Sequence, residues 1–107
     1  QAIVHNGLIF TAGQICLDPK TGKLNNSDFK TEVLQVVKNI NAILKESGSS
    51  LSNVIKCTVY MTNLNNFDIV NSIFKETFKE NFPARSVVEV SKLPKNVNIE
   101  IDVVASS

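Results

Sequence analysis

The stretch NVIKCTVYMT, residues 53–62, is the clearest strand in the chain and limits how the flanking segments can pack. Its residues alternate in polarity, as expected when successive side chains point to opposite faces of a sheet. The predicted apolar face consists of Ile55, Cys57, Val59 and Met61. The opposite, half-polar face consists of Val54, Lys56, Thr58 and Tyr60. The apolar face needs a packing partner, and the half-polar face meets solvent, a cavity or another molecule.

Helical periodicity flanks this strand on both sides. From Ser27 onward, apolar residues recur mostly at steps of three and four, which predicts a helix with one apolar face. We expect Ser27 to cap this helix and Gly48 to end it. A second helix is predicted from about Asn66, and Pro83 lies beyond its end, where proline is common. The inner stripe of this helix consists of Phe67, Val70, Phe74 and Phe78.

Strands are also predicted towards both ends of the chain. LIFTAGQICL, residues 8–17, is apolar and partly β-branched, and the turn DPKTGK follows it. The pattern leaves open whether this N-terminal strand is single or doubled. RSVVEVSKL, residues 85–93, and VNIEIDVVA, residues 97–105, are the last two predicted strands, with PKN between them as a hairpin turn. In that hairpin Arg85 is expected opposite Ala105.

These elements predict one domain over residues 1–107, of the α+β class, with one mixed sheet and two α-helices packed on one face. The other face of the sheet also needs cover. Because a chain of 107 residues has no third layer to spare, we expect another subunit to cover it, which predicts a homo-oligomer.

Composition narrows the functional classes. The net charge is +1 and the charges are mixed, so the basic stripe typical of nucleic-acid binding is absent. No run of about 18 apolar residues predicts a membrane span. The two cysteines, Cys16 and Cys57, do not make a disulfide framework and are interpreted as small buried hydrophobes. His5 is the only histidine, and no metal site is expected.

Three residues are candidates for a site. Arg85 is the only arginine, and its planar fork suits a carboxylate or phosphate, although a surface ion pair is the simpler alternative. Glu100 lies between Ile99 and Ile101, so it points away from the core; it handles a proton or a water if that face lines a cavity, and is unremarkable if the face meets solvent. Gly13 indicates a bulge or a close approach to the backbone.

The predicted hairpin separates two of these candidates. With Glu100 expected opposite Val90, several residues lie between Glu100 and Arg85 along the hairpin. The two side chains can then share a site only if a ligand or water bridges them, or if two subunits contribute one residue each.

Three stretches resemble a known family. PARSVVEVSKLPKNVNIEID, residues 83–102, resembles the C-terminal signature of the reactive intermediate deaminase family, also called the YjgF or L-PSP endoribonuclease family. GLIFTAGQICLDPKTGKL, residues 7–24, resembles its N-terminal strand and turn. NVIKCTVYMTNLNNFDIVNSIFKETF, residues 53–78, resembles its central strand and second helix. The resemblance covers nearly the whole chain.

The resemblance implies a chorismate-mutase-like fold of the bacillus type, assembled as a homotrimer around a central barrel with three clefts between subunits. It implies a hydrolase of the 2-iminobutanoate/2-iminopropanoate deaminase type that uses no cofactor. The implied substrates are enamines and imines such as 2-aminoacrylate, and the products are 2-keto acids and ammonia.

Family roles carry over to individual residues. The resemblance implies that Arg85 clamps the substrate carboxylate, that Glu100 positions the attacking water and that the backbone of Gly13 meets the substrate. Asn71 of the second helix is implied to lie near the cleft. Many members have cysteine where this chain has Val87, so only the backbone of Val87 is expected to line the cleft. Many members also carry a tyrosine just before the segment that begins here with Gln1.

Two rival functions belong to the same resemblance. One is an endoribonuclease that inhibits translation, and the other is a non-enzymatic trimer that binds small ligands or acts like a chaperone. The mixed charge and the lack of a histidine pair make a nucleic-acid partner unexpected, and no membrane partner is expected. We expect a cytoplasmic location, or a mitochondrial one if a presequence preceded Gln1.

Overall fold

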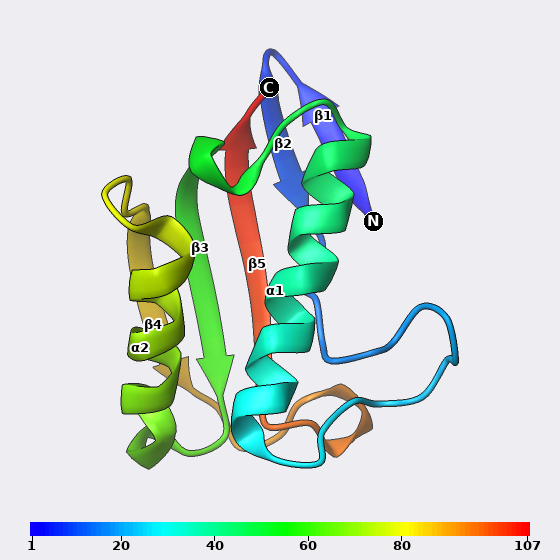
Figure 1. Ribbon diagram of the computed structural model, residues 1–107, viewed down its shortest axis with the longest axis vertical. Helices are drawn as coiled ribbons and strands as arrows, with labels where there is room; N and C mark the ends of the chain where they lie inside the picture. Colours follow the sequence, from blue (N-terminus) through cyan, green and yellow to red (C-terminus); the bar gives the residue numbers. More distant parts are fainter.

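In the computed structural model, which describes residues 1–107, both helices lie on one face of a single mixed sheet (Figure 1). The strands are β1 (Ala2–His5), β2 (Leu8–Thr11), β3 (Val54–Met61), β4 (Ala84–Glu89) and β5 (Ile99–Ser106). The helices are α1 (Phe29–Glu46) and α2 (Phe67–Phe78). The predicted α+β class and the two-layer arrangement are therefore confirmed. Neither helix is both long enough and apolar enough to cross a membrane.

The strand order is β1-β2-β5-β3-β4, so β3 lies between the two C-terminal strands. It pairs antiparallel with β5 and parallel with β4. The predicted hairpin of the last two strands is therefore wrong, and Arg85 does not lie opposite Ala105. The physical reason is that α2 returns the chain to the same end of the sheet, as in a βαβ crossover, so β4 adds in parallel to the outer side of β3. Residues 90–98 then carry the chain past β3 to β5.

The central strand β3 supplies much of the core. Cys57, Val59 and Met61 are buried beneath the helices, as their alternation predicted. Ile55 was expected with them but is 48% exposed. A β-bulge between Val54 and Lys56 shifts the register there, so Val54 is buried in its place.

The N-terminal strand is doubled, because β1 and β2 form a hairpin. Regular pairing of β2 ends at Thr11 rather than at residue 17, and Gln14 makes only an isolated bridge with Ile101. The strand β4 ends at Glu89 rather than at residue 93. At the start of α1, Asp28 rather than Ser27 is the cap, since its Oδ1 accepts the Thr31 N–H at 2.7 Å.

The helix-free face of the sheet is half polar and uncovered. Thr58, Tyr60, Glu100 and Asp102 lie on it, since they alternate with the buried residues of β3 and β5. Exposed apolar side chains lie on it too, among them Phe10 and Val88. The structure thus has the uncovered face that the short chain predicted.

A buried carboxylate joins α1 to the start of β5. Glu32 is fully buried, and its Oε2 accepts the backbone N–H of Asn98 at 2.7 Å and that of Ile99 at 3.2 Å. Its Oε1 accepts the side-chain amide of Asn98 at 2.9 Å. Asn98 precedes β5 and Ile99 is its first residue, so these bonds hold the start of β5 against α1.

We predict that Glu32→Ala lowers the free energy of unfolding by about 2–4 kcal/mol, because three donors, one of them the buried N–H of Ile99, lose their acceptor. Glu32→Gln is the matched control. It keeps one oxygen for the backbone groups, and a flipped Asn98 amide can accept from the new amide, so we expect a loss of about 1 kcal/mol. Urea unfolding at one fixed protomer concentration measures both. Equal stability of wild type and Glu32→Ala would refute this role.

Candidate functional site

Arg85 is the second residue of the edge strand β4, and its side chain turns towards α2. It pairs with Cys57 of β3, whose side chain is buried under the helices, so Arg85 lies on the helix-covered face. Its guanidinium carbon lies 5.0 Å from the ring centre of Phe67 and 5.3 Å from that of Phe74. Both distances are within cation–π range. The aromatic rings thereby hold the charged group in one orientation.

The only hydrogen-bond partner of the guanidinium is the side chain of Asn71. Both Nη groups donate to its Oδ1, each at 3.3 Å. These bonds are long, and the acceptor is a neutral amide. The positive charge therefore has no carboxylate partner within the chain, and its parallel donors remain available to an anion. The alternative interpretation of Arg85 as half of a surface ion pair is excluded.

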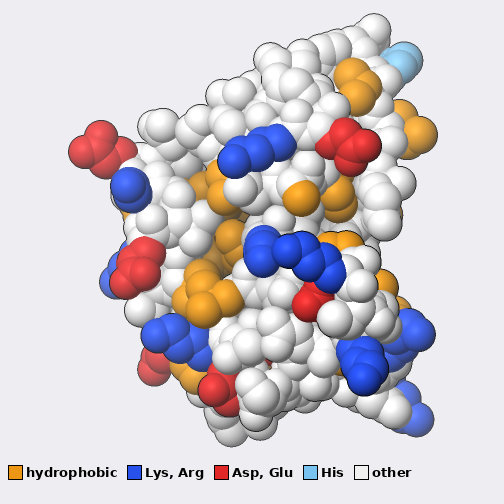
Figure 2. Space-filling model, turned by 45° about the vertical axis from the view of Figure 1, so that its right-hand side comes forward, with side chains coloured by type: hydrophobic (Ala, Val, Ile, Leu, Met, Phe, Trp, Pro, Cys, Tyr) orange, Lys and Arg blue, Asp and Glu red, His pale blue; other side chains and the backbone are white.

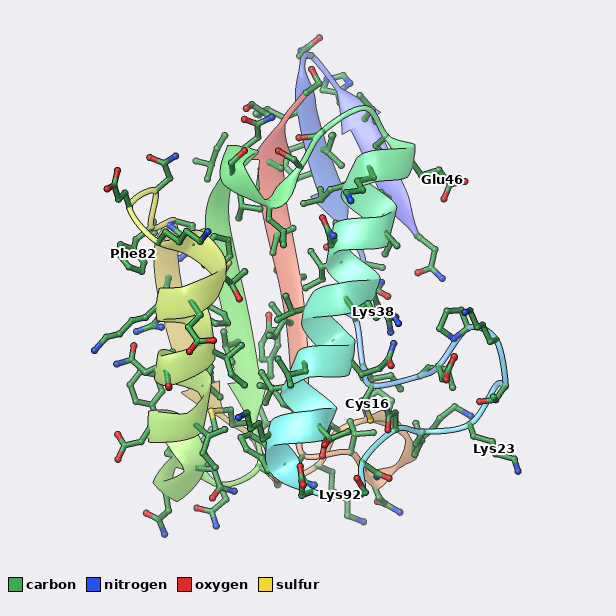
Figure 3. The ribbon with its side chains drawn as sticks, viewed as in Figure 1. Cys16, Lys23, Lys38, Glu46, Phe82 and Lys92 are labelled. Carbon is green, nitrogen blue, oxygen red and sulfur yellow. The ribbon has the colours of Figure 1, made fainter.

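A surface hollow of about 300 Å³ opens beside Arg85. It lies between the end of α2 and the start of β4, where Figure 3 shows Phe82. Phe82 is 57% exposed, so it lines the hollow and does not pack in the core. The lining residues are Asn71, Phe74, Lys75, Phe82, Pro83 and Arg85. We call this group, with Phe67, the arginine half-site.

Glu100 lies on the helix-free face, opposite Tyr60 of β3. Its carboxylate packs on the backbone of Gly13, and a Cβ at that position would overlap Glu100 Oε2. Only glycine therefore leaves room for this carboxylate. The close approach predicted at Gly13 is confirmed, and the approaching group is Glu100. We call Gly13, Tyr60, Glu100 and Asp102 the carboxylate half-site.

Two carboxylates share this face and influence each other. Burial raises the pKa of Glu100, and the negative charge of Asp102 raises it further. Burial also raises the pKa of Asp102, while a hydrogen bond from Thr58 and the charge of Lys56 act in the opposite direction. Glu100 thus has the environment of a group that accepts a proton more readily than an exposed glutamate does.

The two half-sites lie on opposite faces of the same sheet. Arg85 shares a face with Cys57, whereas Glu100 shares the other face with Tyr60. The expectation that both lie along one hairpin is therefore wrong. A sheet separates the side chains, so a small ligand in one chain cannot contact both. Of the alternatives left open by the sequence, a contribution from two subunits is the one compatible with this geometry.

Two other positions near Arg85 differ in their surroundings. Asn71 lines the hollow and also contacts Arg85, so it orients the arginine. Val87 pairs with Val59 and packs half-buried against the core, which leaves its backbone on the free edge of the sheet. His5 lies in β1, at the opposite edge of the sheet from β4.

The sequence pattern did not predict the aromatic rings beside Arg85, the effect of Asp102 on the pKa of Glu100 or the position of Lys75 in the hollow. The spacing of residues in α2 contained a signal for the ring of Phe67 and for Lys75. Phe67, Asn71 and Lys75 recur at steps of four, which places them along one stripe of α2. The structure shows that this stripe faces Arg85 and the hollow. No cluster of three or more His, Cys, Asp or Glu side chains with metal-binding geometry is present.

Comparisons with known proteins are consistent over the whole chain. The family model described as endoribonuclease L-PSP matches residues 1–107. A RutC family protein from Pyrococcus abyssi is 49% identical over 98% of this chain and 83% of its own length. The human protein named 2-iminobutanoate/2-iminopropanoate deaminase is 43% identical over 98% of this chain and 77% of its own length. The crystal structure of a Rid family protein from Yersinia pestis superimposes with a TM-score of 0.97 at 44% identity, covering 100% of this chain and 86% of that one.

The thiols of this chain should be inert in the folded state. Burial raises the pKa of Cys57 to about 12, the nearby charge of Arg85 only partly offsetting it, and burial also raises the pKa of Cys16. Because the thiolate is the reactive form, we predict that neither thiol reacts with Ellman's reagent at mildly alkaline pH, and that both react in denaturant. Rapid labelling of Cys57 in native protein, located by peptide mass spectrometry, would contradict this.

Proposed function

Since the chain belongs to the endoribonuclease L-PSP family, we propose that it hydrolyses reactive enamines and imines of amino acids to 2-keto acids and ammonia. The observation that carries the proposal is an arginine with no carboxylate partner, held by two aromatic rings beside a hollow. The activity in the name of the human relative supports it.

In this proposal Arg85 binds the carboxylate of the substrate. Its two Nη groups replace the long bonds to Asn71 with a bidentate, charge-assisted pair. Asn71 and the rings keep the guanidinium oriented while the ligand enters. The carboxylate is adjacent to the reacting carbon, so fixing it also fixes the position of that carbon.

Glu100 then activates water. An enamine substrate first takes a proton at its β-carbon and loses one from nitrogen, which gives the imine. Glu100 accepts a proton as the water oxygen bonds to the imine carbon, and the nitrogen is protonated as the C=N π bond breaks. The protonated Glu100 then donates its proton to the amino group, and the new hydroxyl group loses its proton to solvent, which restores the proton first taken up by the imine nitrogen. The C–N bond breaks as C=O forms, and ammonia leaves with both shared electrons. The raised pKa of Glu100 brings its basicity closer to that of the groups it must serve.

The active site forms between two subunits in this proposal. The arginine half-site of one chain faces the carboxylate half-site of another, because the two lie on opposite faces within each chain. We propose a homotrimer of the chorismate-mutase-like type, in which the helix-free faces meet around a central barrel. The exposed Phe10 and Val88 on that face are the apolar area that such contacts would bury.

Little further machinery is required. Positioning of reactants contributes up to about 7–11 kcal/mol in ideal systems, and these imines react with water unaided. A clamp, a base and exclusion of bulk water are therefore sufficient.

The geometry favours ribonuclease chemistry less than it favours imine hydrolysis. On the face drawn in Figure 2, lysines are interspersed with acidic side chains instead of forming a stripe. His5 lies at the edge of the sheet away from Arg85.

We predict that Arg85→Ala lowers kcat/KM for 2-aminoacrylate by at least about a hundredfold, because two charge-assisted hydrogen bonds are lost. A pyridoxal-phosphate dehydratase would generate 2-aminoacrylate from serine, and pyruvate release would be followed with and without this protein. Arg85→Lys is the matched control, since it keeps the charge but not the fork, and we expect an intermediate value.

Light scattering must show that both variants keep the assembly of the wild type. Unchanged acceleration by Arg85→Ala would refute the clamp. Binding of a 2-keto acid at Arg85 by wild type that shows no turnover would instead favour the ligand-binding function.

We predict that the acid limb of the kcat/KM profile lies above that of an ordinary glutamate, because a base with a raised pKa is lost to protonation sooner as pH falls. Asp102→Asn removes the charge that raises the pKa of Glu100, so the limb moves to lower pH. Burial, the larger cause, remains. Glu46→Gln, an exposed acid at the end of α1, is the control and should not move the limb. A limb that is unchanged in Asp102→Asn would contradict the coupling.

A further inference from the structure

The hollow beside Arg85 contains a second cation that the proposed reaction does not use. Lys75 lies one turn beyond Asn71 on α2 and lines the hollow with Arg85. Residues four apart on a helix are neighbours on its surface, so Lys75 lies next to Asn71, whose side-chain amide contacts the guanidinium. Of the six lining residues, two are cations and none is an anion.

A structural role for Lys75 does not account for this position. A lysine in the last turn of a helix interacts favourably with the helix dipole, and Lys75 is in the last turn of α2. That interaction does not require the side chain to line a hollow. Lys79, which follows the helix as its C-cap, does not line it.

We propose that the site accepts imines of dicarboxylic amino acids, with the α-carboxylate on Arg85 and the distal carboxylate on Lys75. This inference rests on the proposed function and specifies its substrate class. Two unpaired cations in one hollow favour a dianion over a monoanion of similar size, because each anionic group meets its own positive charge.

The dimensions agree with this assignment. Lys75 lies about 6 Å along the helix axis from Asn71, whose side chain contacts the guanidinium of Arg85, so the two cations line adjacent parts of the hollow. The carboxyl carbons of a four- or five-carbon diacid are about 4–5 Å apart when the chain is extended. The hollow of about 300 Å³ has room for such a molecule. Phe74 and Phe82 supply apolar surface against which the methylene groups of the ligand can pack.

The test compares two substrates in one enzyme. Amino-acid oxidases would generate 2-iminoglutarate from glutamate and 2-iminobutanoate from 2-aminobutyrate, and keto-acid release would give kcat/KM for each. We expect Lys75→Gln to lower the ratio of the dicarboxylic to the monocarboxylic value about fivefold, as loss of one exposed ion pair allows. Added salt should lower the wild-type ratio in the same direction.

Lys38→Gln is the matched control. Lys38 is exposed on α1, outside the hollow and across the molecule from Phe82 (Figure 3), so its removal changes the net charge equally. An equal ratio in wild type, Lys75→Gln and Lys38→Gln would overturn the inference. If the ratio were equal but Arg85→Ala still abolished turnover of 2-iminobutanoate, the proposed function would stand and only the dicarboxylic preference would be lost.

Binding of the product acids separates failure of the inference from failure of the proposed function. Calorimetry would measure the Kd of 2-oxoglutarate and of 2-oxobutanoate for wild type and Lys75→Gln, whether or not either imine is turned over. A preference for 2-oxoglutarate that Lys75→Gln reduces about fivefold supports binding of the distal carboxylate at Lys75. Equal preference in the two proteins overturns it.

Discussion

The pairing of β3 with β4 on one side and β5 on the other determines where every candidate side chain lies. Arg85 is opposite Cys57 and Glu100 is opposite Tyr60, and these two residues of β3 point to opposite faces. One register therefore directs the cation towards α2 and the carboxylate towards the helix-free face. A shift by one residue on either strand would reverse that direction. The division into two half-sites, on which the proposed contribution of a second subunit rests, follows from this pairing.

Each half-site is supported by contacts that keep a charged group oriented without neutralising it. The guanidinium of Arg85 lies over two aromatic rings and donates to a neutral amide, so its charge remains available. Glu100 lies on the backbone of Gly13 in a β5 whose start is held by Glu32. The carboxylate of Glu32 is itself fully satisfied by three donors, so it fixes the strand and takes no part in the site. One carboxylate, Glu32, thus positions the strand, and a different one, Glu100, has the proposed chemical role.

The surface proposed to bind the α-carboxylate also limits what the rest of the proposed substrate can be. The hollow extends from Arg85 along α2, and its walls combine aromatic rings with Lys75. An apolar wall alone discriminates weakly between side chains that differ by a methylene group, whereas a charge at its far end selects for a complementary charge. Selectivity in this site would therefore come from the helix stripe Phe67, Asn71 and Lys75, and the reaction itself from Arg85 and Glu100.

Alternation and helical periodicity were enough to predict two helices, one sheet, their shared face and an uncovered opposite face, because these depend on local spacing of apolar residues. The signature around Arg85 and Glu100 was enough to identify the family and the candidate residues. Strand neighbours were not predictable, since a parallel strand after α2 and an antiparallel hairpin satisfy the same alternation. The bulge that exposes Ile55 and the rings that hold Arg85 were hidden for the same reason. They arise from contacts between residues distant in the chain, and no local pattern records such contacts.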